Sequence, residues 1–173
     1  MDVFEAIRTR RSTRRYQPED VSDEQVKKLL EAAIMAPSAG NMQPWDFIVV
    51  RDEGQKKALA RAALGQMFVA SAPVVIVVCA NKPRTARRYG SRGSELYCLQ
   101  DTAAATQNIL LAATAMGLAG CWVGAFNEEE ASRVLDLPSQ VRPVAILPIG
   151  VPGESPRMPP RIPLSEITHY DHW

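Results

Sequence analysis

The feature that most constrains the fold is an uninterrupted apolar run, Val74 to Ala80, near the middle of the chain. Valine and isoleucine dominate this run, and both residue types favour β-structure. Because successive side chains of a strand point to opposite faces, a strand without polar positions must be covered on both sides. The run therefore predicts a central β-strand in a sheet that carries helices on its faces.

Apolar residues at helical spacing predict the helices. Ser22 and Gln25 have the spacing of a capping box, and Pro37 should end the helix that starts there. Gly117 is a candidate C-cap, and Asn127 is expected to cap a helix with acidic residues in its first turn. The expected helices are a short one around 3–7, one from Ser22 up to Pro37, 55–64, 95–116 and 128–135. Small residues crowd 95–116, so we expect this helix at the core of a dimer.

Shorter apolar runs predict further strands at 47–50, 121–123 and 144–149. Pro148 lies inside the last run, and since proline cannot donate a ladder hydrogen bond, we expect an edge or a bulge there. Residues 81–94 are rich in Arg, Gly and Ser and are expected to form a surface loop. The proline-rich segment 151–163 cannot be helical, so an extended C-terminal arm is expected over about 151–173.

Length and composition favour a single domain over residues 1–173. With 46% hydrophobic and 23% charged residues, a 173-residue chain can bury a substantial core. The net charge of +1 gives no footprint for nucleic acid or a membrane, and the apolar stretch 102–118 contains too many polar residues for a membrane span. Cys79, Cys98 and Cys121 show neither disulfide nor metal-ligand spacing, which favours a reducing cytoplasm.

A local basic cluster, Arg10-Arg11-Ser12-Thr13-Arg14, contrasts with the near-neutral whole. Guanidinium groups bind phosphate through paired, charge-assisted hydrogen bonds, and Ser12 can add a hydroxyl. The cluster suits a phosphate monoester, which carries about two negative charges. A solvated basic turn is the plain alternative, and a nucleic-acid arm is a weaker one because no aromatic residues alternate with the arginines.

A second segment, residues 36–45, lies between a helix and a strand and is dense in turn residues. Asn41 and Gln43 each carry a donor and an acceptor and can bind the polar edge of a heterocycle. Taken alone, this segment is equally compatible with a loop that needs Gly and Pro only for its shape.

The order and spacing of these two segments resemble the nitroreductase family. Members of that family open with an Arg-Arg-Ser-x-Arg stretch and carry, further along, an Ala-Pro-Ser-x-x-Asn-x-Gln-Pro-Trp run that leads directly into a strand. Residues 107–118 are similar to the family's central helix, 120–126 to the strand and turn after it, and 161–167 to its C-terminal arm. The resemblance spans nearly the whole chain.

The resemblance implies an α+β fold, with a mixed β-sheet flanked by helices, in an intertwined homodimer with swapped C-terminal arms. It implies an FMN site at the dimer interface, with Arg10, Ser12 and Arg14 on the phosphate, Arg11 nearby and Arg161 approaching from the arm. The other cofactor-binding residues that it implies are Pro37, Ser38, Ala39 and Asn41, which reach the flavin of the other subunit, and Gln66, Trp122, Val123 and Gly124 around the ring.

The implied activity is an NAD(P)H-dependent oxidoreductase that reduces nitroaromatics, quinones or similar small acceptors. Hydride transfer takes place at flavin N5, toward which the backbone N–H of Gly124 would point, so no side chain has an assigned catalytic role and no metal is expected. One pocket that serves donor and acceptor in turn implies ping-pong kinetics. No dinucleotide-binding fingerprint is present, so the sequence does not choose between NADH and NADPH.

Two alternatives stay open. The same scaffold can carry other FMN chemistry, namely dehalogenation, flavin fragmentation or enone reduction, and a flavin-binding protein without turnover is a second class. Segment 81–94 is a candidate cationic lid that favours an anionic substrate or the nicotinamide phosphates; its charged and aromatic residues are Arg84, Arg87, Arg88, Tyr89 and Arg92. His169 and His172 have a spacing that metal ligands can have, but a solvated tail or an arm contact is the favoured interpretation.

Overall fold

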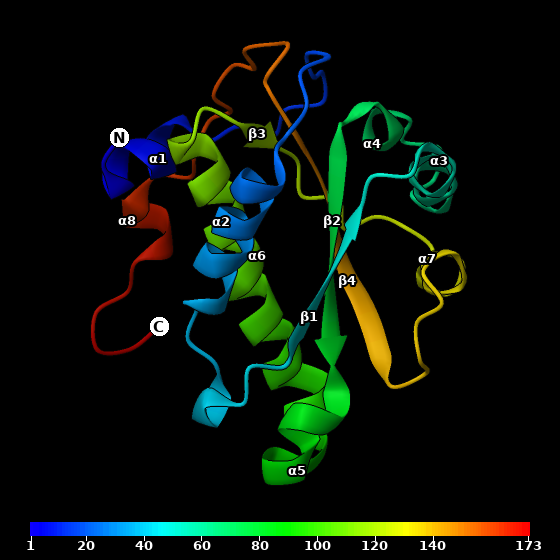
Figure 1. Cartoon of the computed structure of the whole chain (residues 1–173). Coiled ribbons are helices and arrows are strands. Elements are labelled where there is room, and N and C mark those ends of the chain that lie inside the picture. Colours follow the sequence, from blue (N-terminus) through cyan, green and yellow to red (C-terminus); the bar gives the residue numbers. More distant parts are fainter.

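The computed structural model of the chain describes residues 1–173 and has one four-stranded sheet between two layers of helices (Figure 1). The strands are β1 (Trp45–Val50), β2 (Val74–Asn81), β3 (Ala119–Gly120) and β4 (Val141–Gly150), in the order β1-β2-β4-β3. All neighbouring strands pair antiparallel. Parallel pairing is confined to an isolated bridge between Ser12 and Gly120. The expected α+β class is confirmed.

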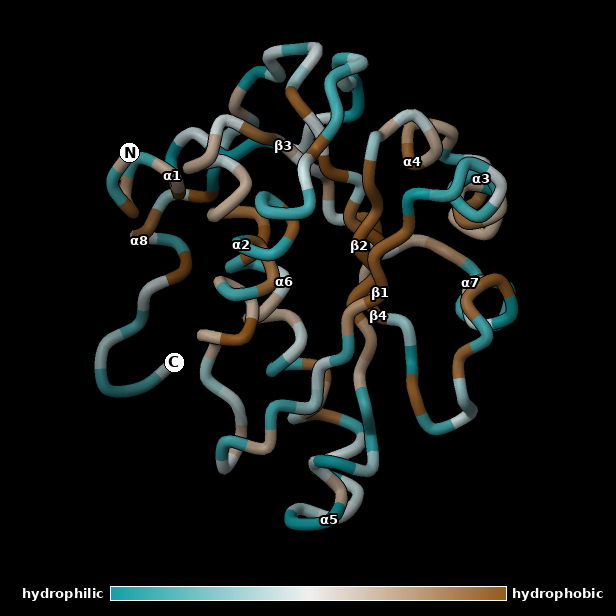
Figure 2. Tube along the Cα trace, viewed as in Figure 1, coloured by the Kyte–Doolittle hydropathy of each residue, from teal (hydrophilic) through white to brown (hydrophobic).

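The predicted central strand is β2; its residues Val74 to Ala80 are buried, and Figure 2 shows the strand as hydrophobic. Alternate residues of β2 face opposite layers. Val74, Ile76 and Val78 pack in a core with α2 (Asp23–Ile34) and α6 (Cys98–Ala115). The residues between them pack in a second core with α3 (Glu53–Ala62), α4 (Phe68–Ser71) and α7 (Glu128–Val134). This two-sided burial explains the missing polar alternation.

Several helix boundaries are confirmed by their caps. The capping box of Ser22 and Gln25 forms at the start of α2, and that helix ends at Ile34, ahead of Pro37. The Asn127 side chain accepts the N–H of Glu130 at the start of α7. The remaining helices are α1 (Val3–Thr9), a 3₁₀ turn η1 (Ala39–Asn41), α5 (Lys82–Arg92), a π-helical turn η2 (Gly93–Tyr97) and α8 (Leu164–Ile167).

The expected surface loop at 81–94 is wrong, because these residues form α5 and η2, which lead directly into α6. Pro83 lies in the first turn, where proline favours a helix start, and arginine is a good helix former. Gly90 has a φ of 56° and kinks the helix, and Gly93 packs against the Thr85 carbonyl. The glycines that suggested a loop therefore permit a kink and a close contact within a helix.

Two strand expectations are also wrong. Of residues 121–123, only Val123 forms a β-bridge, to Ile146, and the Cys121 N–H donates a single long hydrogen bond of 3.4 Å to the Pro148 carbonyl; the preceding pair Ala119–Gly120 forms β3 instead. Pro148 marks neither an edge nor a bulge, because β4 lies between β2 and β3 and its irregularity falls opposite Val78 and Cys79. Proline is tolerated at position 148 because the side of β4 that faces away from β2 carries no long ladder, only the short β3, the hydrogen bond from Cys121 and the bridge at Val123.

The C-terminal segment is extended apart from α8, and every residue from Arg157 to Trp173 is exposed. It leaves the body beside α1 and ends away from the sheet (Figure 1). Its large apolar side chains, Met158, Ile162, Leu164, Ile167, Tyr170 and Trp173, all face solvent. None of the helices of the chain combines the length and the apolar character that crossing a membrane requires.

Candidate functional site

The N-terminal basic cluster lies along the end of the sheet. After α1 the chain pairs with β3, where the N–H of Thr13 donates to the carbonyl of Gly120 at 3.1 Å. The Tyr16 hydroxyl lies 2.6 Å from the Thr13 carbonyl oxygen and 3.1 Å from that of Pro148, so it ties the segment to β4. Burial raises the pKa of Tyr16 far above its ordinary value, so the hydroxyl stays a donor.

Glu154 holds the same segment from the other side. Its carboxylate accepts the backbone N–H groups of Arg14 at 2.7 Å and Arg15 at 3.2 Å. The acid therefore bonds the main chain and leaves both guanidinium groups unneutralised. None of the arginines at positions 8, 10, 11, 14 and 15 forms an ion pair with a carboxylate. The cluster is a concentration of uncompensated positive charge.

Arg10, Ser12 and Arg14 are alternate residues of the segment that pairs with β3 through the bridge between Ser12 and Gly120, so their side chains point to the same side. Thr13, between two of them, is buried on the other side. The Arg14 guanidinium lies 3.5 Å from the Ser12 carbonyl oxygen. Burial raises the pKa of the thiol of Cys121, which follows β3; Arg14, a hydrogen bond from Ser12 and Arg10 act in the opposite direction. We call Arg10, Ser12 and Arg14 the phosphate cluster, after the role that the sequence predicts for them.

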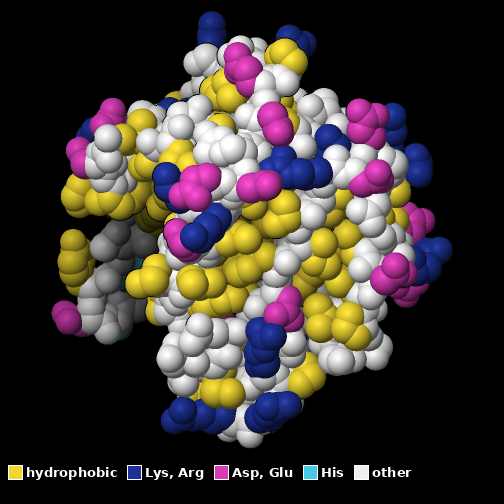
Figure 3. Space-filling model, viewed as in Figure 1, with side chains coloured by type: hydrophobic (Ala, Val, Ile, Leu, Met, Phe, Trp, Pro, Cys, Tyr) yellow, Lys and Arg dark blue, Asp and Glu magenta, His cyan; other side chains and the backbone are white.

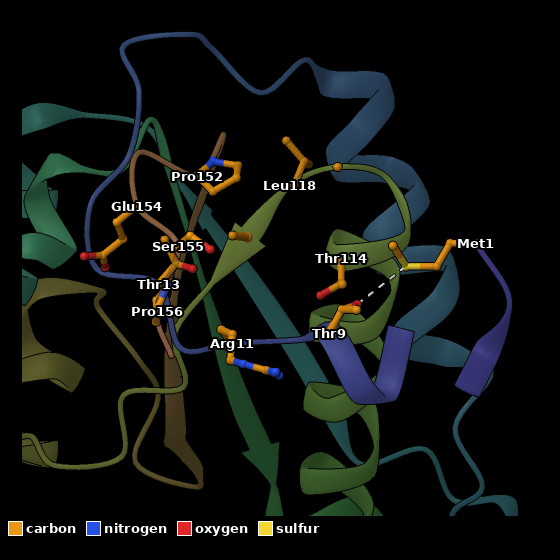
Figure 4. A pocket seen from close by; sticks show the side chains of 12 residues that line it. Met1, Thr9, Arg11, Thr13, Thr114, Leu118, Pro152, Glu154, Ser155 and Pro156 are labelled. Atoms are coloured by element: carbon orange, nitrogen blue, oxygen red, sulfur yellow. Dashed lines mark hydrogen bonds between the residues drawn. The ribbon is translucent and has the colours of Figure 1, made fainter. Parts of the chain in front are cut away.

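Arg11 has a different environment. Its guanidinium donates to the carbonyl oxygens of Arg8 and Arg10, both at 2.7 Å, at the C-terminal end of α1. It also lines a cavity of about 240 Å³ together with Thr13 and Glu154 (Figure 4). Arg11 thus stabilises the helix end, where carbonyl groups lack partners within the helix.

The second predicted segment is held rigidly at the start of β1. The Ser38 hydroxyl oxygen accepts the N–H of Gln43 at 3.0 Å, and the Gln43 amide donates to the Asn41 side chain at 3.2 Å. Gly40, Asn41 and Gln43 all have left-handed backbone conformations, with φ of 55°, 55° and 47°. Pro37 precedes this turn and is exposed.

Asp101, in the first turn of α6, fixes the position of this turn. Its carboxylate oxygens accept the N–H of Ala39 at 3.1 and 3.2 Å. The side chain is buried, and burial raises its pKa, while the Ala39 hydrogen bond opposes that change. The turn at 38–43 is therefore attached to one end of the central helix.

The phosphate cluster lies at the other end of α6. Thr114, in the last turn of α6, lines the same cavity as Arg11. Asp101, in the first turn of α6, accepts the N–H of Ala39. At 1.5 Å per residue, these two ends of the helix are about 20 Å apart. One chain therefore does not bring Pro37, Ser38, Ala39 and Asn41 together with the phosphate cluster.

The third predicted segment, Trp122 to Ala125, runs from Cys121 to a cavity that it shares with the first turns of α6. It continues directly from Cys121, and the Gln66 amide donates to the Ala125 carbonyl at 3.0 Å. The Arg14 guanidinium lies 5.6 Å from the centre of the Phe68 ring, in the helix that follows Gln66. Val123 is buried, whereas Trp122 and Gly124 are exposed and line a cavity of about 250 Å³.

Arg161 is placed on the exposed arm. Within the chain its guanidinium contacts only the carbonyl of the neighbouring Pro160, at 3.4 Å. The single chain therefore does not add Arg161 to the phosphate cluster. Among the other tail residues, the His169 ring stacks on Trp173 with centroids 4.2 Å apart.

Comparison with known proteins shows which family shares this arrangement. The family model described as "Nitroreductase family" matches residues 7–72 and 64–151. This chain belongs to the nitroreductase family. A relative from Methanothermobacter thermautotrophicus, whose name assigns it provisionally as an NADH dehydrogenase/NAD(P)H nitroreductase, is 38% identical over 160 residues, which cover 90% of this chain and 80% of its own. The FMN reductase [NAD(P)H] of Bacillus subtilis is 31% identical, with coverage of 98% and 74%.

Solved nitroreductase-family structures superpose closely on this chain. The B. megaterium protein NfrA2 gives a TM-score of 0.92 at 28% identity, over 100% of this chain and 76% of its own. An NADPH:FMN oxidoreductase from Vibrio harveyi in complex with NAD+ gives 0.91 at 27% identity, over 99% and 77%.

Three residues that hold the predicted site segments in place were not predicted as site residues. Tyr16 and Glu154 orient the phosphate cluster, and Asp101 orients the turn at 38–43. Asp101 had a visible signal, because it is the only charged residue in α6. Tyr16 and Glu154 had none, because their partners lie far along the chain.

Proposed function

We propose that this chain binds FMN and catalyses NAD(P)H-dependent reduction of nitroaromatics, quinones or similar small acceptors. The observation that carries the proposal is the phosphate cluster: two guanidinium groups and a hydroxyl stand at alternate positions of one segment, and neither guanidinium forms an ion pair with a carboxylate. This segment pairs with Gly120, and the exposed backbone of Gly124 follows on the same stretch of chain. The names of the related FMN reductase and NADPH:FMN oxidoreductase support this assignment.

The residues present fit FMN at both ends of that cofactor. A phosphate monoester carries about two negative charges, which Arg10 and Arg14 can balance while Ser12 donates its hydroxyl. At the ring end, the N–H of Gly124 makes no hydrogen bond within the chain. A Cβ at Gly124 would meet only the Trp122 side chain, at 3.9 Å, so the space above this backbone is open. A flat heterocycle can approach the peptide plane there.

FMN supplies the redox chemistry in this proposal, by taking two electrons from NADH or NADPH and delivering them to the acceptor. The chain itself binds and orients. The phosphate cluster fixes one end of the cofactor, Gln66 holds the segment 122–125 in place, and the N–H of Gly124 donates a hydrogen bond at the ring. No side chain needs to act as a general acid or base on the protein side.

We further propose that two subunits build each site. The turn at Pro37 to Asn41 is attached to the opposite end of α6 from the phosphate cluster of its own chain, and the two ends of that helix are about 20 Å apart, so the turn is free to contact the cofactor bound by a partner. The exposed apolar arm is unfavourable in an isolated chain and favours burial against a second copy, which would bring Arg161 to the partner's phosphate cluster. Both points support the swapped homodimer that the resemblance implies.

Spectroscopy of the purified protein tests the function. A flavin absorption spectrum that bleaches on anaerobic addition of NADH or NADPH, and returns on addition of a nitroaromatic or a quinone, is the expected result. A spectrum that does not bleach indicates a flavin-binding protein without turnover. A colourless protein that takes up no added FMN overturns the proposal.

A further inference from the structure

The lower end of the molecule carries a second basic cluster, visible in Figure 3 as dark blue side chains over α5. The basic residues of α5 are Lys82, Arg84, Arg87, Arg88 and Arg92, and the helix contains no acidic residue. Only Arg84 is neutralised: its guanidinium pairs with Asp46 at 2.7 Å. Arg87, Arg88 and Arg92 have no carboxylate partner.

Arg88 and Arg92 differ from ordinary surface arginines because two tyrosines order them. The Arg88 guanidinium lies 5.5 Å from the centre of the Tyr89 ring, and that of Arg92 lies 5.3 Å from the centre of the Tyr97 ring. Arg92 Nε also donates to the Tyr97 hydroxyl at 2.9 Å. The two rings meet edge to face, with centroids 5.2 Å apart. We call these four residues the Arg-Tyr cluster.

This arrangement leaves hydrogen-bond donors available in a fixed place. The terminal nitrogens of Arg92 have no partner in the chain, and Arg88 makes no hydrogen bond. A guanidinium held on an aromatic face loses less side-chain entropy when it binds an anion. Uncompensated charge also raises the local concentration of anions.

The Arg-Tyr cluster touches the turn that is proposed to reach the partner's flavin. A methyl group at Gly40 would lie 2.5 Å from the Tyr89 hydroxyl oxygen and 2.9 Å from a guanidinium nitrogen of Arg88. The turn and the ends of these two side chains are therefore in direct contact, and a side chain at Gly40, whose φ of 55° already favours glycine, would displace them. A flavin site bordered by this turn would therefore have the Arg-Tyr cluster beside it.

The geometry points to a subsite, formed by Arg88 and Arg92 on Tyr89 and Tyr97, for the phosphate or carboxylate group of a molecule that enters the flavin site. This inference rests on the proposed function. The two sources of such a group are the ribose phosphate that distinguishes NADPH from NADH, and the carboxylate of an acidic acceptor. In either case the anion forms charge-assisted, bidentate hydrogen bonds with a guanidinium.

The test compares the Arg88→Gln/Arg92→Gln double variant with an Arg87→Gln/Arg61→Gln control. The control removes the same charge at two exposed arginines, on α5 and α3, that lie on no tyrosine ring. Loss of a charge-assisted hydrogen bond lowers the binding affinity about tenfold or more. If the subsite binds the ribose phosphate, we expect the double variant to have a KM for NADPH about tenfold higher, with kcat and the KM for NADH unchanged. If it binds a carboxylate, we expect the KM for para-nitrobenzoate to rise in the same way, with the KM for the uncharged para-nitrobenzamide unchanged. Either result supports the subsite and identifies its source.

A binding measurement separates this inference from the proposed function. Calorimetric titration with ADP-ribose and with its ribose-phosphorylated analogue needs no turnover, and benzoate serves as the carboxylate probe. The double variant should lose the preference for the phosphorylated analogue, or the affinity for benzoate, while the control keeps it. If double variant and control behave alike in all arms, the subsite is overturned, whereas a native protein that oxidises neither nicotinamide overturns only the proposed function.

Discussion

Arg14→Ala is expected to weaken FMN binding about 10- to 100-fold while leaving the apoprotein as stable as before. Arg14 is exposed, and within the chain its guanidinium has only a 3.5 Å contact with the Ser12 carbonyl and a contact 5.6 Å from the centre of the Phe68 ring. Such exposed contacts contribute about 0.5 kcal/mol or less to folding. A charge-assisted hydrogen bond to phosphate contributes about 1.5–3 kcal/mol, which is the basis of the expected loss.

The assay is a titration of apoprotein with FMN, followed by flavin fluorescence, beside a urea unfolding curve. Arg15→Ala is the matched control, because it removes the same charge from the adjacent residue, whose side chain makes no hydrogen bond or ion pair while its N–H stays on Glu154. The control should bind FMN nearly as well as the native protein. Equal losses in the two variants, or no loss with Arg14→Ala, would refute the placement of the phosphate.

Burial raises the pKa of the Asp101 carboxyl, so ionisation of this group lowers the stability of the fold as the pH rises through the folded-state pKa. Asp101→Asn keeps an acceptor oxygen and cannot ionise, so its stability relative to the native chain should increase from acid to neutral pH in urea titrations. A stability difference that does not change with pH would contradict this. Tyr16→Phe removes a hydroxyl 2.6 Å from a carbonyl oxygen and should lower the free energy of unfolding by about 1 kcal/mol, whereas an unchanged unfolding curve would show that this hydrogen bond is dispensable. Gly120→Ala places a methyl group 2.6 Å from Ile149 Cδ1 and 3.0 Å from the Pro148 carbonyl oxygen. It should cost about 1–3 kcal/mol and lower the thermal midpoint; an unchanged midpoint would contradict the close packing.

The elements that the sequence predicts correctly are those that local rules determine. β2 follows from seven apolar residues in a row, and the start of α2 follows from a capping box whose two partners are three residues apart. α5 was missed because Gly90 and Gly93 were interpreted as loop residues, whereas one kinks the helix and the other packs on Thr85. The edge or bulge expected at Pro148 was wrong because the pairing on one side of β4 depends on distant residues.

The candidate site also has a part that a local sequence pattern predicts and a part that depends on residues far apart in the chain. The order Arg10, Ser12, Arg14 is visible in the sequence, and the structure places these alternate residues on one side of the segment that pairs with β3. The bridge between Ser12 and Gly120 and the hydrogen bond from the Arg14 N–H to Glu154 join segments more than a hundred residues apart, which no local pattern encodes. The separation of the phosphate cluster from the turn at 38–43 follows from the length of α6.

The central claim is that each FMN site combines the phosphate cluster of one subunit with the turn at 37–41 of its partner, and complementation tests it most directly. An Arg10→Ala/Arg14→Ala variant and a Ser38→Ala/Asn41→Ala variant, each shown to fold as a flavin-deficient dimer, are produced together in one cell. A mixed dimer then has one site with both halves native and one with both halves altered, so random pairing should restore FMN and reductase activity to about a quarter of the native sites. Mixed dimers that stay colourless and inactive would contradict the shared site.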